Sequence, residues 1–316
     1  MPHPKAPPNK SLDASGISGL VFDISSVTQL LPAAPTPPFG VNYYAPDIAA
    51  RSVGYEMRLV GLLLEAKDRA VSQATIINRW REDMNSTKRT ARVAGLLYLL
   101  MGLTAAFSIV YIPSVFIVAG DVTATANRIK AAESLYRIGI ASDFIAQIIF
   151  IFLVLTLYHL LKGVNKRHAL LMVTLVIVSV PMSFVNMLNQ TAPLIVLSDA
   201  DFLSVFDQHQ LQALAMVFLK LRSHGIAAVS TFWGLWLFPF GLLVYRSGFF
   251  PRILGVLLII ACFAYLASSF TFILLPPYSH IVSQIMLIPF AIGELSIIFW
   301  LLIKGAKAQP LDDQAS

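Results

Sequence analysis

Charged residues and cysteine are both scarce in this chain of 316 residues, and each scarcity excludes a class of protein. Only 13% of the residues are charged while 57% are hydrophobic, a balance unlike that of soluble globular domains. The single cysteine, Cys262, lies in the apolar run FPRILGVLLIIACFAYLASSF, so one chain can form neither a disulfide framework nor a thiolate metal cluster. The composition therefore predicts a membrane protein.

The basic residues are too dispersed to form a nucleic-acid surface. The formal charge is +6, but the Lys and Arg residues stand singly at the ends of apolar runs instead of clustering with aromatic residues. In those positions they are typical of anchors at the membrane surface. We therefore expect membrane lipids as partners and no nucleic acid.

Six apolar runs have the length that a membrane-spanning helix requires. About 20 helical residues, rising about 1.5 Å each, cover the roughly 30 Å hydrocarbon core of a bilayer. Pro, Gly, Asp and Asn residues separate the runs and favour turns. The sequence thus predicts an all-α, polytopic membrane protein, a bundle of six transmembrane helices over residues 91–112, 138–161, 168–190, 225–245, 251–275 and 281–303.

The first 83 residues differ from the rest of the chain. They contain two Pro-rich stretches, MPHPKAPP and LPAAPTPPFGVNYYAP, and no apolar core typical of a secretory signal. The first long apolar run follows Met84, in MNSTKRTARVAGLLYLL, which is typical of a bacterial start. We predict a poorly ordered extension over residues 1–83, either upstream of a true start at Met84 or a cytoplasmic appendage. A membrane domain over 84–305 and a disordered tail over 306–316 follow.

The distribution of Lys and Arg predicts that both termini lie in the cytoplasm. In that orientation ten basic residues lie at the inner flanks and five in the outer connections. The inner ten are Lys88, Arg89, Arg92, Lys162, Lys166, Arg167, Arg246, Arg252, Lys304 and Lys307. The outer five are Arg128, Lys130, Arg137, Lys220 and Arg222. We interpret all of them as topology anchors.

The two outer connections are long and have helical character. Residues 119–137 contain helix-forming sequence after a predicted cap at Asp121. Residues 191–224 carry an apolar stripe at Leu211, Leu214, Ala215, Phe218 and Leu221. That spacing predicts an amphipathic outer helix, which either lies on the membrane surface or over the mouth of the bundle, or acts as a lid for a pocket.

Two acidic residues lie within the predicted spans, where a charge costs roughly 2.5 to 3.5 kcal/mol on insertion scales. Glu294 is about 20 Å from the outer end of the sixth span and so near the midplane, whereas Asp143 is only about 8 Å deep in the second. Because no Lys or Arg stands at the depth of Glu294 in a predicted span, we expect Glu294 to be protonated at neutral pH and functional. For Asp143 a structural or interfacial role is the main alternative.

Further polar and aromatic groups lie at comparable depths on other spans. Gln147 is one turn from Asp143 on the same helix face, and Asn186 belongs to the third span. His224 stands at the outer end of the fourth span and Trp233 lies within it. If these side chains face one another, they line a polar funnel open to the outside. The alternative is that they serve as interhelical hydrogen bonds and packing.

Helix-breaking residues stand close to Glu294. Pro289 precedes it by five residues and Gly293 by one, which allows local unwinding of the sixth span. Carbonyl groups exposed beside a carboxylate are a way in which carriers bind cations. The alternative is a proline kink that serves packing.

From Met84 to about Lys304 the chain resembles the bacterial integral-membrane family defined by domain of unknown function 4386. The matching stretches include MNSTKRTARVAGLLYLL, AAESLYRIGIASDFIAQ, FWGLWLFPFGLLVYRSGFFPRILGVLL and IGELSIIFWLLIKG. The resemblance implies a multi-pass protein of the bacterial inner membrane. It transfers no activity, cofactor or catalytic residue.

Motifs for catalysis are missing from the sequence. It has no GxSxG, HExxH, Walker or dinucleotide-binding pattern, and its outer histidines lack the close spacing of a metal site. We therefore assign no catalytic residue, cofactor or metal. The leading hypothesis is binding or transport of a small or lipid-like ligand, or of a coupling proton, in an outward-facing cavity. An intramembrane enzyme acting on lipid or isoprenoid substrates and a non-catalytic partner subunit are the alternatives.

Overall fold

The chain is seen in a computed structural model that describes residues 46–306, with side chains from Asn85 onward and for part of residues 58–78. All regular elements in this range are helical, which confirms the predicted all-α class. Most of the predicted C-terminal tail and residues 1–45 of the predicted extension lie outside the described residues. Residue contacts divide the chain into two units, Met1–Arg69 and Ala70–Ser316, and the six spans all lie in the second.

The first described helix, α3 (Pro46–Ala106), runs through the predicted boundary at Met84. Pro46 stands at its first position, where a missing backbone N–H is tolerated, and no proline follows until Pro113. Helix-forming Glu, Ala, Arg and Lys residues fill much of the stretch before Met84. Residues 46–83 are therefore helical, and translation from Met84 stays a prediction.

Six helical segments are long and apolar enough to cross a membrane, which confirms the predicted count. They are Asn85–Phe116, Glu133–Leu161 (α6), Lys166–Val196 (α7), Gln208–Arg246, Arg252–Leu274 (α10) and Pro276–Ile303. Three of them join several elements. The first combines the end of α3 with the π-helix η1 (Phe107–Tyr111) and α4 (Ile112–Phe116). The fourth combines α8 (Gln208–Leu235) with α9 (Leu237–Arg246). The sixth combines η3 (Pro276–Tyr278) with α11 (Ser279–Ile303).

Polar caps determine where α5 (Val122–Ala131) and α8 begin. The Asp121 side chain accepts a hydrogen bond from the N–H of Ala124 at 2.8 Å and starts α5, at the position predicted for a cap. Asp207 forms a reciprocal capping box with Gln210 and starts α8. Between α7 and α8 the chain has only a short 3-10 turn, η2 (Asp201–Leu203).

The predicted amphipathic outer helix differs from the structure in its extent. Residues 208–224 form the first part of α8, which continues into the fourth span without a break. The buried side of this part consists of Gln212, Ala215, Leu219 and Arg222, while Leu221 of the predicted stripe is 48% exposed. The shift arises because two polar side chains on this side have partners on neighbouring helices, Gln212 with Thr123 of α5 and Arg222 with Gln190 of α7.

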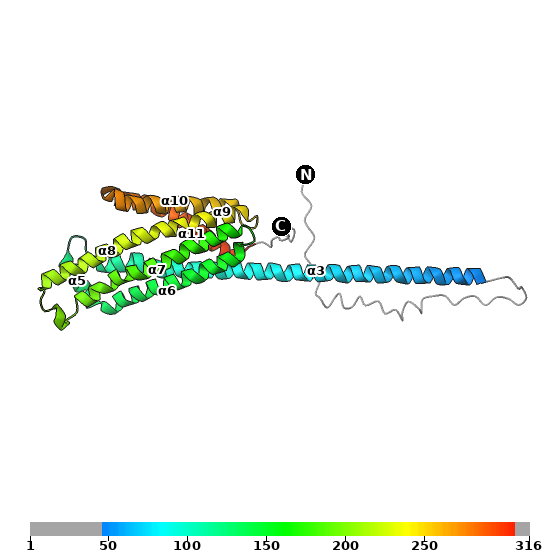
Figure 1. Ribbon diagram of the computed structural model, residues 1–316, viewed down its shortest axis with the longest axis horizontal. Helices are drawn as coiled ribbons and strands as arrows, with labels where there is room; N and C mark the ends of the chain where they lie inside the picture. Colours follow the sequence, from blue (N-terminus) through cyan, green and yellow to red (C-terminus); the bar gives the residue numbers. More distant parts are fainter. Residues whose placement is uncertain (1–45, 307–316) are drawn as a thin grey trace, which may run out of the picture. The chain divides into compact units, whose positions relative to one another are not determined.

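Neighbouring helices approach closely where glycines face them. Figure 1 shows α6, α7 and α8 side by side, and α10 contacts α8, α9 and α11. A Cβ atom added to Gly255 of α10 would lie 2.5 Å from the carbonyl oxygen of Gly241 on α9. One added to Gly293 of α11 would lie 2.9 Å from the carbonyl oxygen of Leu257 on α10. These close crossings place α11 against α10 at the level of Glu294.

Candidate functional site: two buried charge centres and a shared cleft

Arg222 lies inside the bundle, which corrects its interpretation as an outer topology anchor. Its side chain is only 7% exposed, and its Nη2 atom lies 3.7 Å from Oδ2 of Asp143 on α6. The interpretation failed because α8 begins at Gln208, well before the predicted span, so position 222 is within a helix that packs on α7. A guanidinium group among membrane helices is retained only where acceptors surround it.

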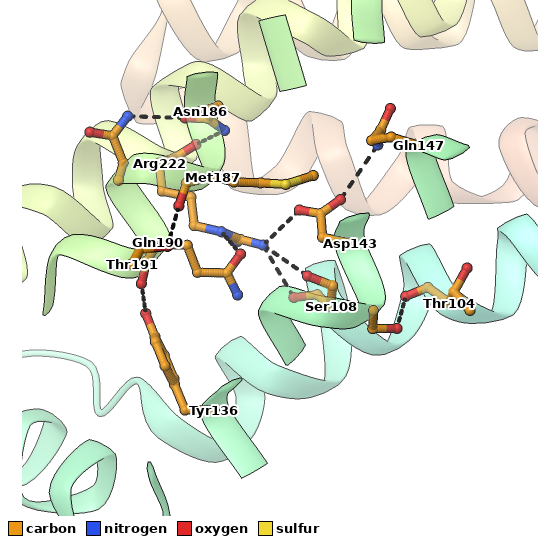
Figure 2. Close-up of polar contacts among 12 residues, drawn as sticks. Thr104, Ser108, Tyr136, Asp143, Gln147, Asn186, Met187, Gln190, Thr191 and Arg222 are labelled. Carbon is orange, nitrogen blue, oxygen red and sulfur yellow. Dashed lines mark hydrogen bonds and ion pairs between the residues drawn. The ribbon is translucent and has the colours of Figure 1, made fainter. Parts of the chain in front are cut away.

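Polar groups from three neighbouring elements surround this guanidinium, as Figure 2 shows. Arg222 Nε donates to Oε1 of Gln190 on α7 at 2.9 Å. Its Nη2 donates to both the carbonyl and the hydroxyl oxygen of Ser108 at 3.3 Å. Ser108 lies in η1, and π turns of this kind are frequent at functional sites. Asp143 in turn accepts a hydrogen bond from Gln147 Nε2 at 3.4 Å.

Glu294 on α11 is held by two tyrosine hydroxyl groups. The Tyr98 hydroxyl of α3 donates to Oε2 at 2.9 Å, and the Tyr265 hydroxyl of α10 donates to Oε1 at 2.7 Å. The Tyr265 ring stacks on Phe290 with 4.1 Å between ring centroids, which orients its hydroxyl group. Among the side chains that the structure describes, none that is basic forms an ion pair with Glu294. Its contacts are neutral.

A cavity of about 530 Å³ lies beside this carboxyl group, and we call it the Glu294 cavity. Four of its lining side chains are polar and not aromatic: Gln147, Ser230, Ser283 and Glu294. The remaining walls are apolar or aromatic: Met101, Gly102, Ala105, Ala106, Ile109, Val110, Ala146, Phe150, Ile226, Trp233, Trp236, Tyr265, Leu287 and Phe290. Gln147 is 3% exposed, and its Oε1 has no hydrogen-bond partner among the described residues. An acceptor that is buried without a partner is expensive unless a ligand or water reaches it.

A second cavity, of about 320 Å³, adjoins the first and is called here the Arg222 cavity. Gln190, Arg222 and Ser269 contribute polar groups to its wall. The two cavities share six lining residues, which are Ile109, Ile226, Ser230, Tyr265, Ser283 and Phe290. They therefore form one cleft between the first, fourth, fifth and sixth spans.

The structure brings together three of the six predicted site residues. Gln147, Trp233 and Glu294 all line the Glu294 cavity. Asp143 lines neither cavity, although its carboxyl group contacts Gln147 on one side and Arg222 on the other.

The other two predicted residues stand apart from the cleft. Asn186 donates from Nδ2 to the carbonyl oxygen of Arg222 at 3.1 Å, so it serves as a bond between α7 and α8. His224 is exposed, and its ring meets Phe272 edge-on at 5.1 Å between centroids. Neither lines one of the two cavities. The described residues hold no group of three or more His, Cys, Asp or Glu side chains that could bind a metal ion.

The sixth span is not unwound next to Glu294. α11 is helical from Ser279 to Ile303, with Pro289 inside it. Gly293 instead provides the space for α10, because a side chain there would meet Ala261 at 2.8 Å. The carbonyl-lined cation site that the Pro289 and Gly293 pattern allowed is therefore not formed.

Several residues of the site were not predicted as such, among them Tyr98, Tyr265 and Arg222. Both tyrosines do carry a signal in the sequence, because a tyrosine far from the membrane interface needs a hydrogen-bond partner for its hydroxyl group. Tyr98 lies in the run LLYLLMG and Tyr265 in CFAYLASS, each well inside a span. Arg222 carried no such signal because the start of the fourth span was placed too late.

A bundle of six apolar helices, with an acidic side chain at the wall of an internal cavity, defines a multi-pass membrane protein. Its family follows from the sequence. The family model described as Domain of unknown function (DUF4386) matches residues 93–305, and the chain belongs to this family, as its resemblance predicted.

Among curated proteins, an uncharacterized protein of Archaeoglobus fulgidus is 40% identical over 76 residues. The match covers 24% of this chain and 43% of the relative, so the chain spans less than half of the curated relative's length. No solved structure matches. A ligand or reaction must therefore be argued from the cleft itself.

Proposed function

We propose that this protein binds a small or lipid-like ligand in the Glu294 cavity, as a membrane carrier or as a ligand-binding membrane protein. The observation that carries the proposal is the setting of Glu294. It is a carboxyl group with neutral partners only, at the wall of a mostly apolar cavity. Acidic side chains among membrane helices normally pair with basic groups, and one that faces a cavity points to a ligand or proton site.

The size and position of the cavity also support a ligand. Its volume of about 530 Å³ lies within the range of small-molecule sites. Two of its lining residues, Val110 on the first span and Leu287 on the sixth, are 66% and 63% exposed. In a membrane, apolar residues as exposed as these contact lipid. Their exposure supports entry of a lipid-soluble molecule from the membrane, between the first and the sixth span.

The alternative functions have less support. An intramembrane enzyme would need Asp143 and Glu294 at one pocket, whereas Asp143 lines neither cavity and is engaged by Arg222 and Gln147. A partner-binding subunit without a ligand would need no cavity with an unpartnered amide oxygen in its wall. The enzyme alternative therefore lacks its second carboxyl group, and the partner-subunit alternative gives the setting of Glu294 no purpose.

We place the protein in a bacterial inner membrane with both termini in the cytoplasm. The support is the excess of basic residues at one end of the spans. Arg222 is buried in the bundle and no longer counts as an outer anchor, so ten basic residues at the inner flanks compare with four in the outer connections. The burial of Arg222 therefore increases the difference in basic residues between the two sides of the membrane.

Native mass spectrometry of the purified protein tests the proposed cavity. Gly102 lines the cavity and an added Cβ meets nothing within 4 Å, so Gly102→Trp should fill the space without a backbone clash. Gly61→Trp is the matched control, because Gly61 also has open space around it and lies in the other unit. We expect a bound small molecule on the wild type and on the control and its loss from Gly102→Trp. A bound mass retained in full by Gly102→Trp, or none on the wild type, would overturn the proposal.

A further inference from the structure

The two buried charge centres of the cleft differ in how far their charge is neutralised. Arg222 has a carboxylate, Asp143, 3.7 Å away, and three further acceptor atoms from Gln190 and Ser108. Glu294 has two hydroxyl donors and no basic partner among the side chains that the structure describes. The uncompensated charge of the cleft is therefore the negative charge of an ionised Glu294.

The wall of the Glu294 cavity carries two groups that can accept from a cation, an amide oxygen and a carboxylate. The Gln147 amide donates from Nε2 to Asp143, which leaves its Oε1 buried and without a partner in the described part of the chain. The Glu294 carboxylate is the second acceptor. No Lys, Arg or His side chain lines this cavity. An anionic ligand would find no basic side chain in this wall and only neutral donors, which are the Ser230 and Ser283 hydroxyls, the indole N–H groups of Trp233 and Trp236, and the tyrosine hydroxyl that already binds Glu294.

Aromatic rings form much of the remaining wall. Trp233 and Trp236 reach the cavity from the fourth span, and Phe150, Tyr265 and Phe290 line it from three other helices. The faces of such rings attract a cation within about 6 Å, most strongly when water is excluded. Aromatic walls combined with a carboxylate are the chemistry that recognises an organic ammonium group.

We propose that the ligand of the Glu294 cavity is a lipophilic organic cation, whose charged group lies between Glu294 and the aromatic walls. This inference rests on the proposed function and gives it a substrate class. The cation takes the place of the proton that neutralises the carboxyl group when the cavity is empty. The titratable groups that face Glu294 are Tyr98 from α3 and Tyr265 from α10. The apolar body of the ligand extends toward Ile109 and Ile226, where the two cavities meet.

Two probes of the same shape and opposite charge test the sign of the ligand directly. Binding of tetraphenylphosphonium and of tetraphenylborate is measured by titration calorimetry on the full chain in neutral detergent. We expect saturable binding of the phosphonium at least about tenfold tighter than of the borate. Equal binding of the two ions, tighter binding of the borate, or no binding of either overturns the inference. This comparison uses the wild type and does not depend on whether a variant folds.

Two variants then locate the binding site. Glu294→Gln keeps the shape of the side chain and removes its charge, and we expect it to weaken phosphonium binding about tenfold or more. Glu133→Gln makes the same change in a half-exposed i,i+4 pair with Arg137 outside the cleft, and binding should stay within twofold of wild type. Unchanged binding in Glu294→Gln overturns the inference. If instead a bound mass still depends on Gly102 while the phosphonium does not bind, the proposed function stands and only the ligand class is wrong.

Discussion

The Nη2 atom of Arg222 lies 3.7 Å from Oδ2 of Asp143, so a cation of α8 and an anion of α6 neutralise each other inside the bundle. This pair separates two carboxyl groups that the sequence had placed in one funnel. Asp143 belongs to an internal network with Arg222, Gln190 and Ser108, while Glu294 faces the cavity.

Replacing Arg222 by methionine should destabilise the protein strongly, because Asp143 would keep a buried charge without its partner. Breaking a buried pair in this way costs about 3 to 5 kcal/mol. The measurement is the unfolding midpoint in detergent, with Lys220→Met, an exposed cation two residues away on α8, as the control. Asp143→Asn added to Arg222→Met removes the stranded charge and should recover part of the loss. If Arg222→Met alone is as stable as the wild type, the pair of Arg222 and Asp143 has no structural role.

Tyr98→Phe should remove one of the two hydrogen bonds to Glu294. A hydrogen bond to a carboxyl group in a buried site contributes about 1 to 3 kcal/mol, so the unfolding midpoint should fall. Tyr111→Phe is the matched control, because its ring is 48% exposed and stacks on Phe107 through the ring alone. If both substitutions lower the midpoint equally, the Tyr98 bond does not hold Glu294 in place.

Gly255→Ala should loosen the packing of α9 against α10. The new methyl group would meet the carbonyl oxygen of Gly241 at 2.5 Å, and overpacking of this kind costs about 1 to 3 kcal/mol. Gly102→Ala, where nothing lies within 4 Å, should be neutral or slightly stabilising because alanine favours helix. Thermal unfolding of the two variants side by side decides the matter. The prediction fails if Gly255→Ala is the more stable of the two.

Labelling of single cysteines tests the orientation. Asp199→Cys, between α7 and α8, should react with a membrane-impermeant maleimide in intact cells, whereas Gly163→Cys, between α6 and α7, should react only after permeabilisation. The native Cys262 is 2% exposed and provides a low background. The reverse pattern of labelling would place both termini outside.

The sequence was sufficient to predict the spans but only part of the site. Apolar length and turn residues determine where a chain crosses a membrane, and each predicted span overlaps one of the six helices, although the fourth helix begins at Gln208, well before residue 225. The rotation of a helix about its axis could not be predicted in the same way, because it depends on packing at glycines such as Gly234 and Gly293. Asp143 and His224 were therefore placed at the funnel, whereas neither of them lines one of the two cavities. Arg222 was assigned to a loop because the polar start of α8 lowers the hydropathy that defines a span.

The most direct test of the account is the reaction of Glu294 with dicyclohexylcarbodiimide, a lipid-soluble reagent for carboxylic acids, in native membranes. Mass spectrometry of the digested protein then locates the modified residue. We predict modification of Glu294 and not of Asp143, because Glu294 shares a cavity wall with the exposed apolar residues Val110 and Leu287, whereas Asp143 lines neither cavity. Gly102→Trp should block the reaction. An unmodified Glu294, or equal modification in wild type and Gly102→Trp, would contradict the claim that this cavity receives a ligand from the membrane.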